Sequence, residues 1–234
     1  MDFDAVRGQV VLVTTRAGDT TTWGYDGASW KKISPVSAEP IARCGARADY
    51  DSVRQQVVMF GGCADDCDGG SDGAACANPL DDTWTWTPDG WRQVSPATTP
   101  PPRGHHGFAF DRSRGRVAMT GGFDASGTRL GDMWEWNGTD WAEVATMPVP
   151  APIASHALTW DGEALLSAGG NHRTGAPFTL RHNGQRFVDP CDNNGCTAVP
   201  GSSEEGSAVY DPIRNQVIAF GGFGSAPRST WRWM

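Results

Sequence analysis

Six cysteines are the residues whose type and spacing most directly predict chemistry in this chain. They are Cys44, Cys63, Cys67, Cys76, Cys191 and Cys196. Their even number and loop-like surroundings favour disulfides and an oxidising compartment. Closely spaced Cys-x-x-Cys pairs, which are typical of structural zinc sites, are absent from the sequence, and their absence also argues against a redox-active pair. We therefore expect Cys191 to bond to Cys196. We also expect at least one disulfide among the four earlier cysteines, in any of three pairings.

Histidines and arginines are the next candidates. His106 and His156 each lie five residues before an aspartate that recurs along the chain, so they occupy equivalent positions in a repeat. Two such imidazoles could line a ligand funnel or bind a metal, but no third ligand is evident, which favours a packing role. A cationic, imidazole-bearing centre would hold a polar or anionic group such as a sugar acid. The candidate ligand-binding residues are Arg43, Arg103, His105, His106, His156, Asn171, His172 and Arg173.

Motifs for other chemistry are weak or missing. The segment Ala64-Asp65-Asp66-Cys67-Asp68 begins a carboxylate-rich stretch of the kind that Ca²⁺ prefers. It lacks the alternation and closing Glu of an EF-hand loop, so we expect a solvated acidic loop. The sequence has no Gly-rich phosphate loop. We accordingly assign no catalytic residue, no metal and no cofactor.

Composition limits the partners. The chain carries 19 Lys and Arg against 27 Asp and Glu, a net charge of −8, and no basic block, so we expect no nucleic-acid binding. No stretch approaches 18 uninterrupted apolar residues, so we expect no membrane span. Met1 leads directly into a strand-like run rather than a signal peptide. We expect any secretory signal to lie upstream or to have been removed, and the protein to be extracellular, periplasmic or on the cell surface.

A repeat supplies the elements that must position these side chains. An aromatic residue and an aspartate precede a short turn and an apolar run, which often ends in Gly-Gly. The repeat aspartates are Asp4, Asp51, Asp111, Asp161 and Asp211. Four of these begin an Asp-x-x-Arg turn, in which the carboxylate accepts backbone N–H bonds. Each copy therefore predicts two antiparallel strands, a and b.

A second motif completes each repeat. Pairs such as Trp84/Trp86 and Trp134/Trp136 alternate along a strand, so both rings lie on one sheet face. Asp-Gly or Asn-Gly follows, which favours a tight hairpin, and then another aromatic such as Trp91 or Trp141. The motif adds strands c and d. Four-stranded meanders of about 50 residues, repeated along a chain, are typical of β-propeller blades.

The repeat resembles that of Kelch and galactose-oxidase-type propellers, on Asp82-Thr83-Trp84, Asp132-Met133-Trp134, the Gly-Gly pairs and the Asp-Gly or Asn-Gly turns. The resemblance implies a single all-β domain, 1–234, of about five four-stranded antiparallel blades, with the first and last incomplete. The approximate blade units are 1–43, 44–102, 103–152, 153–202 and 203–234. Because related propellers have six or seven blades, we expect a fragment of a larger ring, or an atypical incomplete one.

The resemblance leaves two function classes open. We expect a secreted, non-catalytic scaffold that binds a protein or a glycan. The alternative is a carbohydrate-active propeller enzyme, galactose oxidase-like or sialic acid epimerase-like, with catalytic residues missing or outside this chain. Tyr25, Tyr50 and Tyr210 hold positions that Trp or Phe fills in other repeats, so they indicate packing rather than copper chemistry. We expect any ligand on the face that carries the variable b–c and d–a loops.

Overall fold

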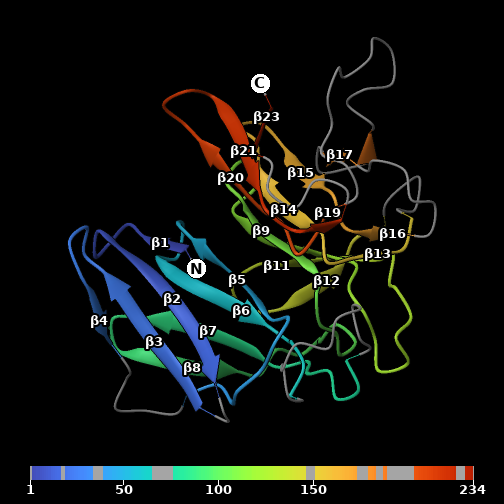
Figure 1. Cartoon of the computed structure of the whole chain (residues 1–234). Coiled ribbons are helices and arrows are strands. Elements are labelled where there is room, and N and C mark those ends of the chain that lie inside the picture. The colour runs from blue at the N-terminus through green and yellow to red at the C-terminus, as the bar shows by residue number, and fades with distance from the viewer. Residues whose placement is uncertain are drawn as a thin grey trace.

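The computed structural model describes residues 2–16, 19–33, 39–64, 76–145, 151–172, 179–182, 187–188, 203–224 and 230–233. Every regular element in this part of the chain is a strand, and none is a helix (Figure 1). The described residues accordingly include no helix with the length and hydropathy needed to cross a membrane.

Five main antiparallel sheets follow one another along the chain. The first contains β1 (Asp2–Asp4), β2 (Gln9–Arg16), β3 (Asp19–Tyr25) and β4 (Trp30–Lys32). The second contains β5 (Arg47–Asp51), β6 (Gln56–Phe60), β7 (Thr83–Thr87) and β8 (Gly90–Val94). The third contains β9 (Gly107–Asp111), β10 (Arg116–Thr120), β11 (Met133–Trp136) and β12 (Trp141–Glu143). The fourth contains β14 (Ala157–Trp160), β15 (Leu165–Ala168), β17 (Thr179–His182) and β18 (Phe187–Val188). The fifth contains β20 (Ser207–Asp211), β21 (Gln216–Phe220) and β23 (Thr230–Trp233).

The sheets are the blades of a β-propeller, which confirms the predicted fold class (Figure 1). The first strand of each blade contacts the first strand of the next, in the order β1, β5, β9, β14 and β20. Strand a is therefore innermost. The sequence predicted an incomplete first blade, but β1, only three residues long, pairs with β2 and gives that blade four strands. The last blade has three strands among the described residues.

Short pairings near the inner strands add a second layer of contacts. β13 (Ile153–Ala154) pairs with β16 (Asn171–His172), and β19 (Ser203–Glu204) pairs with β22 (Phe223–Gly224). Single bridges join Cys44 to Cys63 and Gly104 to Phe123 in the corresponding places. In the second to fifth blades, the segment before strand a is therefore held beside the segment after strand b.

The repeat aspartates form the predicted a–b turns. The Asp51 carboxylate accepts N–H bonds from Val53 and Arg54, both at 3.0 Å, and Arg54 also pairs with it at 2.7 Å. Asp111 accepts the same backbone bonds, but the hydrogen bonds of the Arg114 guanidinium go to Glu135 of β11, and Arg114 lies 3.8 Å from the Asp111 carboxylate. The turn is thus constant. The arginine pairs with the repeat aspartate in the first, second and fifth blades, and in the third blade it also binds Glu135.

The Gly-Gly pairs allow blades to approach each other. A Cβ on Gly121 would lie 2.2 Å from the carbonyl oxygen of Ile153, which belongs to the next blade. A Cβ on Gly122 would lie 3.1 Å from the Cβ of His106 in its own blade. Both glycines have positive φ, of 61° and 104°. The Gly122 N–H donates to that same Ile153 oxygen at 2.8 Å, so the contact is a bond between blades as well as a close approach.

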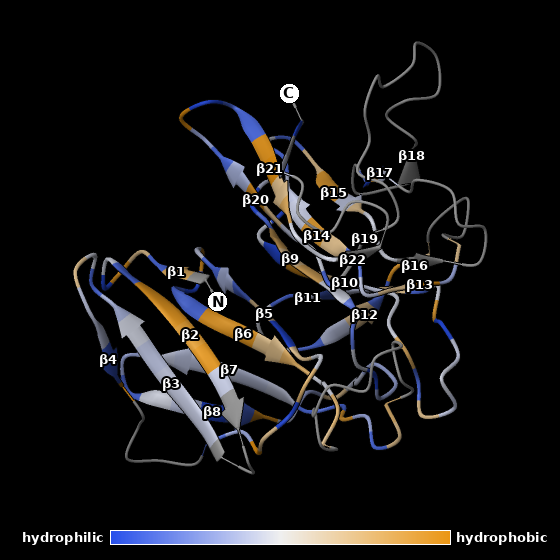
Figure 2. Ribbon diagram, in the orientation of Figure 1, coloured by the Kyte–Doolittle hydropathy of each residue, from blue (hydrophilic) through white to orange (hydrophobic). Residues whose placement is uncertain are grey.

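Aromatic side chains fill the spaces between blades. Phe60 of β6 packs edge-on against Trp141 of the third blade, at 5.3 Å between ring centroids. The indole N–H of Trp141 donates to the Thr83 hydroxyl at 3.0 Å, and that of Trp91 donates to the Thr22 hydroxyl at 2.9 Å. Strand d of the second and third blades thus reaches back to strand c of the preceding blade. The apolar strands β2 and β6 lie in these interiors (Figure 2).

The first and last blades expose apolar positions that are buried elsewhere. Phe220, at the end of β21, is 60% exposed, whereas Phe60, at the same place in β6, is fully buried. Phe3 of β1 is 52% exposed, whereas its counterpart Phe110 is buried. The same repeat position is therefore core or surface according to whether another blade covers it.

Candidate functional site

A belt of backbone hydrogen bonds surrounds the axis. Gly45, His105, Ser155 and Glu205 occupy one repeat position, just before strand a, and have φ of 61°, 58°, 56° and 60°. The His105 N–H donates to the Gly45 oxygen at 2.8 Å, the Ser155 N–H to the His105 oxygen at 2.7 Å, and the Glu205 N–H to the Ser155 oxygen at 2.9 Å. In His105, Ser155 and Glu205, the left-handed backbone directs the N–H toward the preceding blade. The belt fixes these four residues relative to one another.

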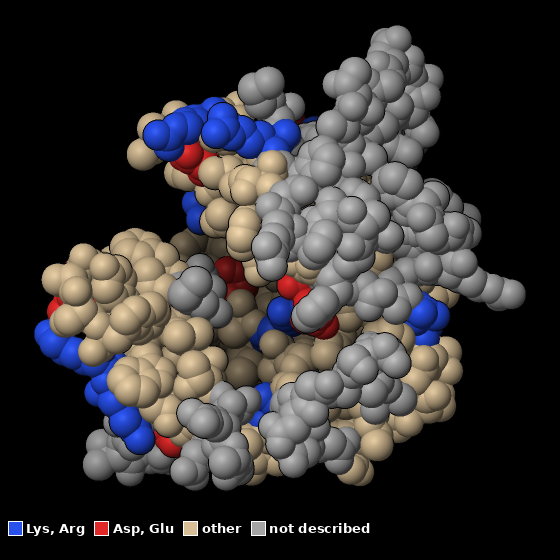
Figure 3. Space-filling model, viewed as in Figure 1, with Lys and Arg blue, Asp and Glu red and all other residues tan. Residues whose placement is uncertain are grey.

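A charged cluster stands on this belt, and we call it the axial cluster: Arg47, His105 and Glu205. Arg47 donates to one Glu205 oxygen at 3.0 Å, and Nδ1 of His105 lies 2.6 Å from the other. Their side chains are 30%, 19% and 33% exposed. The space-filling view shows charged atoms of both signs in the hollow between the blades (Figure 3). The axial cluster thus presents donors and an acceptor to solvent from three different blades.

Glu205 is ionised in this setting. Burial alone would raise its pKa, but the hydrogen bond from His105 and the charge of Arg47 act in the opposite direction, and the pKa falls to about 2. Because the carboxylate carries no proton, Nδ1 of His105 must be the donor in their bond. With Nδ1 occupied by that bond, Nε2 is the ring nitrogen left to contact another group.

Arg43 and Arg103 lie on the predicted face but are turned into the protein. Arg103 is fully buried and donates to both carboxylate oxygens of Asp132, at 2.6 and 2.7 Å. It also donates to the carbonyl oxygens of Pro101 and Gly121. Arg43 repeats this arrangement with Asp82. We call these two pairs the arginine staples, because each joins the segment before strand a to strands b and c.

His106 and His156 also point into the interior rather than the hollow. Both are buried, and Nε2 of His156 lies 2.8 Å from the Thr120 hydroxyl oxygen. Burial lowers the pKa of His156 to about 3, with a smaller effect from the charge of Arg47. Burial and then the charge of Arg103 hold the pKa of His106 well below its usual value. Neutral, packed imidazoles agree with the structural role that the sequence favoured.

The remaining sequence candidates divide between described and undescribed parts of the chain. Asn171 and His172 form β16 beside the belt segment Ile153–Ala154. Arg173, Cys191 and Cys196 lie outside the described residues, as do Cys67 and the acidic residues Asp65, Asp66 and Asp68. The disulfide Cys63–Cys76 confirms that at least one pair forms among the four early cysteines. Cys44 is not in a disulfide in the described structure.

Sequence reasoning missed Arg47 and Glu205. Glu205 follows His105 and Ser155 at intervals of 50 residues, so aligning the repeats at this position would have placed it beside His105. Arg47 stands where the later repeats have Gly107, Ala157 and Ser207. Because the later repeats have small residues at this position, the charged side chain of Arg47 was the sequence signal that the position faces open space.

The fold is that of a β-propeller, and the axial cluster is a polar site beside the central axis. No family model and no curated protein matches the sequence.

Proposed function

We propose that this propeller is a non-catalytic scaffold that binds a glycan in the hollow above the axial cluster. The observation that supports the proposal is the exposed Arg47–Glu205–His105 arrangement, beside two arginines that are fully engaged in packing. A carboxylate accepts hydrogen bonds from sugar hydroxyls, and a guanidinium donates to them, so a neutral ion pair suits a polyhydroxylated ligand. Loops held by a rigid ring supply the rest of such a site.

We infer further that the propeller is of the Kelch type and is secreted. The arginine staples support the first inference, since they give the motif aspartates Asp82 and Asp132 a bidentate partner in equivalent blades. The indole N–H groups of Trp84 and Trp134 bind the same two carboxylates. The Cys63–Cys76 disulfide supports the second inference, because disulfides persist in oxidising compartments.

Glycan-array binding tests the site with two arginine variants. Arg47→Gln should weaken binding by about 10- to 100-fold, the value of a hydrogen bond from a charged group. Arg54→Gln is the matched control, because Arg54 lies in the a–b turn at the other end of the same hairpin. Binding lost with Arg54→Gln but kept with Arg47→Gln would place the ligand on the opposite face.

One observation favours a second candidate, a carbohydrate-active enzyme. A carboxylate bound to Nδ1 is the arrangement that orients a histidine as a general base. Glycans that bind the protein should be incubated with it and analysed by mass spectrometry. Unchanged glycan supports the scaffold, whereas a product that is absent with His105→Gln would establish the enzyme.

A further inference from the structure

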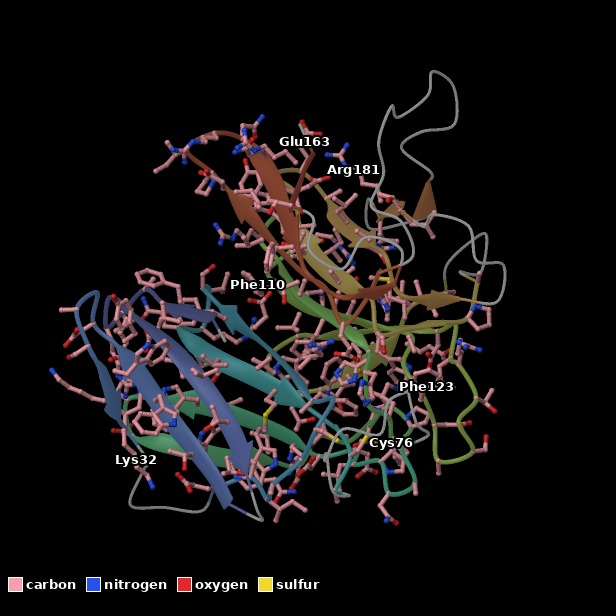
Figure 4. The ribbon with its side chains drawn as sticks, in the orientation of Figure 1. Lys32, Cys76, Phe110, Phe123, Glu163 and Arg181 are labelled. Carbon is pink, nitrogen blue, oxygen red and sulfur yellow. A yellow bond between two sulfur atoms is a disulfide. The ribbon has the colours of Figure 1, made fainter. Side chains whose placement is uncertain are left out.

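Three sulfur atoms and an imidazole meet beside the belt. Cys44 and Cys63 lie opposite each other, with backbone N–H···O bonds of 3.0 and 2.7 Å in the two directions. Their Sγ atoms and a ring nitrogen of His105 lie within 4.8 Å of one another. Cys76 Sγ is bonded to Cys63 Sγ at 2.03 Å, so it belongs to the same group. Cys76 lies on the same loop-bearing side of the ring as Phe123 (Figure 4).

Two glycines make this convergence possible. A Cβ on Gly104 would lie 2.4 Å from Cys63 Sγ and 3.3 Å from Cys76 Sγ, so only glycine leaves room for both sulfurs. A Cβ on Gly45 would lie 2.8 Å from Nε2 of His105. Gly45 directly follows Cys44, and Gly104 directly precedes His105. The backbone thus approaches the group closely from two blades.

His105 is held in the orientation of a metal ligand. Its Nδ1 donates to Glu205 at 2.6 Å, and its Nε2 edge faces the segment that carries Cys44. Histidines that bind metals generally donate their other ring N–H to a carboxylate or carbonyl, which fixes the tautomer and the ring plane. Glu205, in turn, is held by Arg47 at 3.0 Å.

We propose that Cys44, Cys63, Cys76 and Nε2 of His105 form a zinc-type metal site when the Cys63–Cys76 disulfide is reduced. Three thiolates and an imidazole are an established ligand set for tetrahedral Zn²⁺, with Zn–S of about 2.3 Å and Zn–N of about 2.0 Å. The Sγ atoms of Cys44 and Cys63 and a ring nitrogen of His105 already lie within 4.8 Å of one another. Once the disulfide is reduced, the Cys76 side chain must turn toward the same centre. This inference does not depend on the proposed glycan function.

The site is controlled by oxidation. A dithiol reductant gives two electrons and two protons to the disulfide and itself becomes a disulfide, leaving Cys63 and Cys76 as thiols. Metal binding then displaces three protons from the three thiols into solvent. Re-oxidation joins Cys63 to Cys76 and leaves only Cys44 and His105 as ligands, too few to hold the ion. In an oxidising compartment the disulfide form prevails, so the metal form belongs to protein that has not been oxidised or that a dithiol has reduced.

Titration with Co²⁺ tests the proposal on the full chain. The protein is reduced with dithiothreitol, desalted under nitrogen and compared with the untreated disulfide form. The reduced protein should bind one equivalent, with thiolate-to-cobalt charge-transfer absorption and the visible bands of tetrahedral Co²⁺, and Zn²⁺ should displace it. The disulfide form should show neither. Absence of charge-transfer absorption from folded, reduced protein would overturn the proposal.

Variants identify the ligands. Cys44→Ser, Cys76→Ser and His105→Asn should each weaken Co²⁺ binding by at least about 100-fold. Cys67→Ser and the double variant Cys191→Ser/Cys196→Ser are matched controls and should leave binding unchanged. If Cys67→Ser abolishes binding while Cys76→Ser does not, the assigned ligand set is wrong. His105→Cys should keep a tetrahedral spectrum with stronger charge transfer, which tests the position even if His105→Asn misfolds.

Glu205 is a positioning residue in this site. Glu205→Gln should weaken metal binding by about 10- to 100-fold while the spectrum of the bound Co²⁺ stays the same. Arg47→Gln, which tests the glycan site, leaves all four ligands in place and should retain cobalt binding. An unaltered affinity in Glu205→Gln would show that the carboxylate does not orient His105.

Discussion

Five residues other than glycine have a left-handed backbone in the described structure, and they fall into two repeat positions. His105, Ser155 and Glu205 belong to the belt. Gln55 and Asn215 end the a–b turn, where the first and third blades have Gly8 and Gly115. The belt residues are held by bonds between blades. Gln55 is exposed and has glycine counterparts, so its backbone strain serves no described contact.

Gln55→Gly should therefore stabilise the protein. A left-handed residue with a Cβ costs roughly 1–2 kcal/mol, and the greater freedom of glycine in the unfolded chain offsets part of the gain. We expect a net increase of about 0.5–1 kcal/mol in the free energy of unfolding, measured by urea denaturation. Gln93→Gly, at an exposed position of β8, is the control and should destabilise the protein. Equal destabilisation by both changes would contradict the argument.

The buried His156 should make stability depend on pH. Its pKa is about 3 when folded and near 6.5 when unfolded, so between these values the unfolded state binds more protons. The stabilisation is complete above pH 6.5 and is lost as the pH falls toward 3. The slope is about 1 kcal/mol per pH unit for this histidine. Urea denaturation from pH 5 to 6.5 should show a smaller slope for His156→Gln, and an unchanged slope would contradict the assignment.

At the scale of elements, the arginine staples join strands through guanidinium groups that are almost completely buried. Arg103→Met should leave Asp132 with an uncompensated charge and destabilise the protein by about 3–5 kcal/mol. Arg214→Met, which breaks the exposed pair with Asp211, should leave the urea midpoint unchanged. Comparable losses in the two variants would show that burial does not distinguish these pairs.

The Trp141–Thr83 bond couples two blades. Trp141→Phe removes the donor and Thr83→Val removes the acceptor, and each change should destabilise the protein by about 1–3 kcal/mol. The double variant leaves no unpaired group, so its cost should fall short of the sum by about 1 kcal/mol. Chemical denaturation of the four proteins measures this coupling, and strict additivity would mean that the bond contributes nothing beyond packing.

At the scale of the whole molecule, the loss of stability caused by a substitution depends on whether a neighbouring blade covers the residue. Phe60→Ala should destabilise the protein by about 3–5 kcal/mol, because the next blade covers that ring. Phe220→Ala, at the same repeat position, should change the stability by less than about 0.5 kcal/mol. Thermal unfolding compares them directly. A large loss with Phe220→Ala would show that this face is covered in solution.

The repeat was enough to predict the strands, their order within a blade and the a–b turns, because each depends on local alternation and turn chemistry. The site was harder to predict. Arg43 and Arg103 are the same residue type at the same repeat position, as two contacts to one ligand would be. Their actual partners, Asp82 and Asp132, lie 39 and 29 residues further along the chain. Arg47 and Glu205 meet only because the ring brings blades 158 residues apart to one axis. Pairing across that distance has no local sequence signal.

The tryptophan–threonine bonds also bear on how the chain folds without mistakes. Repeated units of similar sequence can dock in the wrong order, which is a common failure of repeat proteins. Thr22 and Thr83 each accept an indole N–H from the following blade. Between the third and fourth blades, Met133 stands in place of the threonine and offers only a weak acceptor sulfur. Phe187 stands in place of the tryptophan and has no N–H in its side chain. A fourth blade docked against the second would bury the Thr83 hydroxyl without a partner, at a cost of about 1–3 kcal/mol. The differences between the repeats therefore favour the native order of the blades during folding.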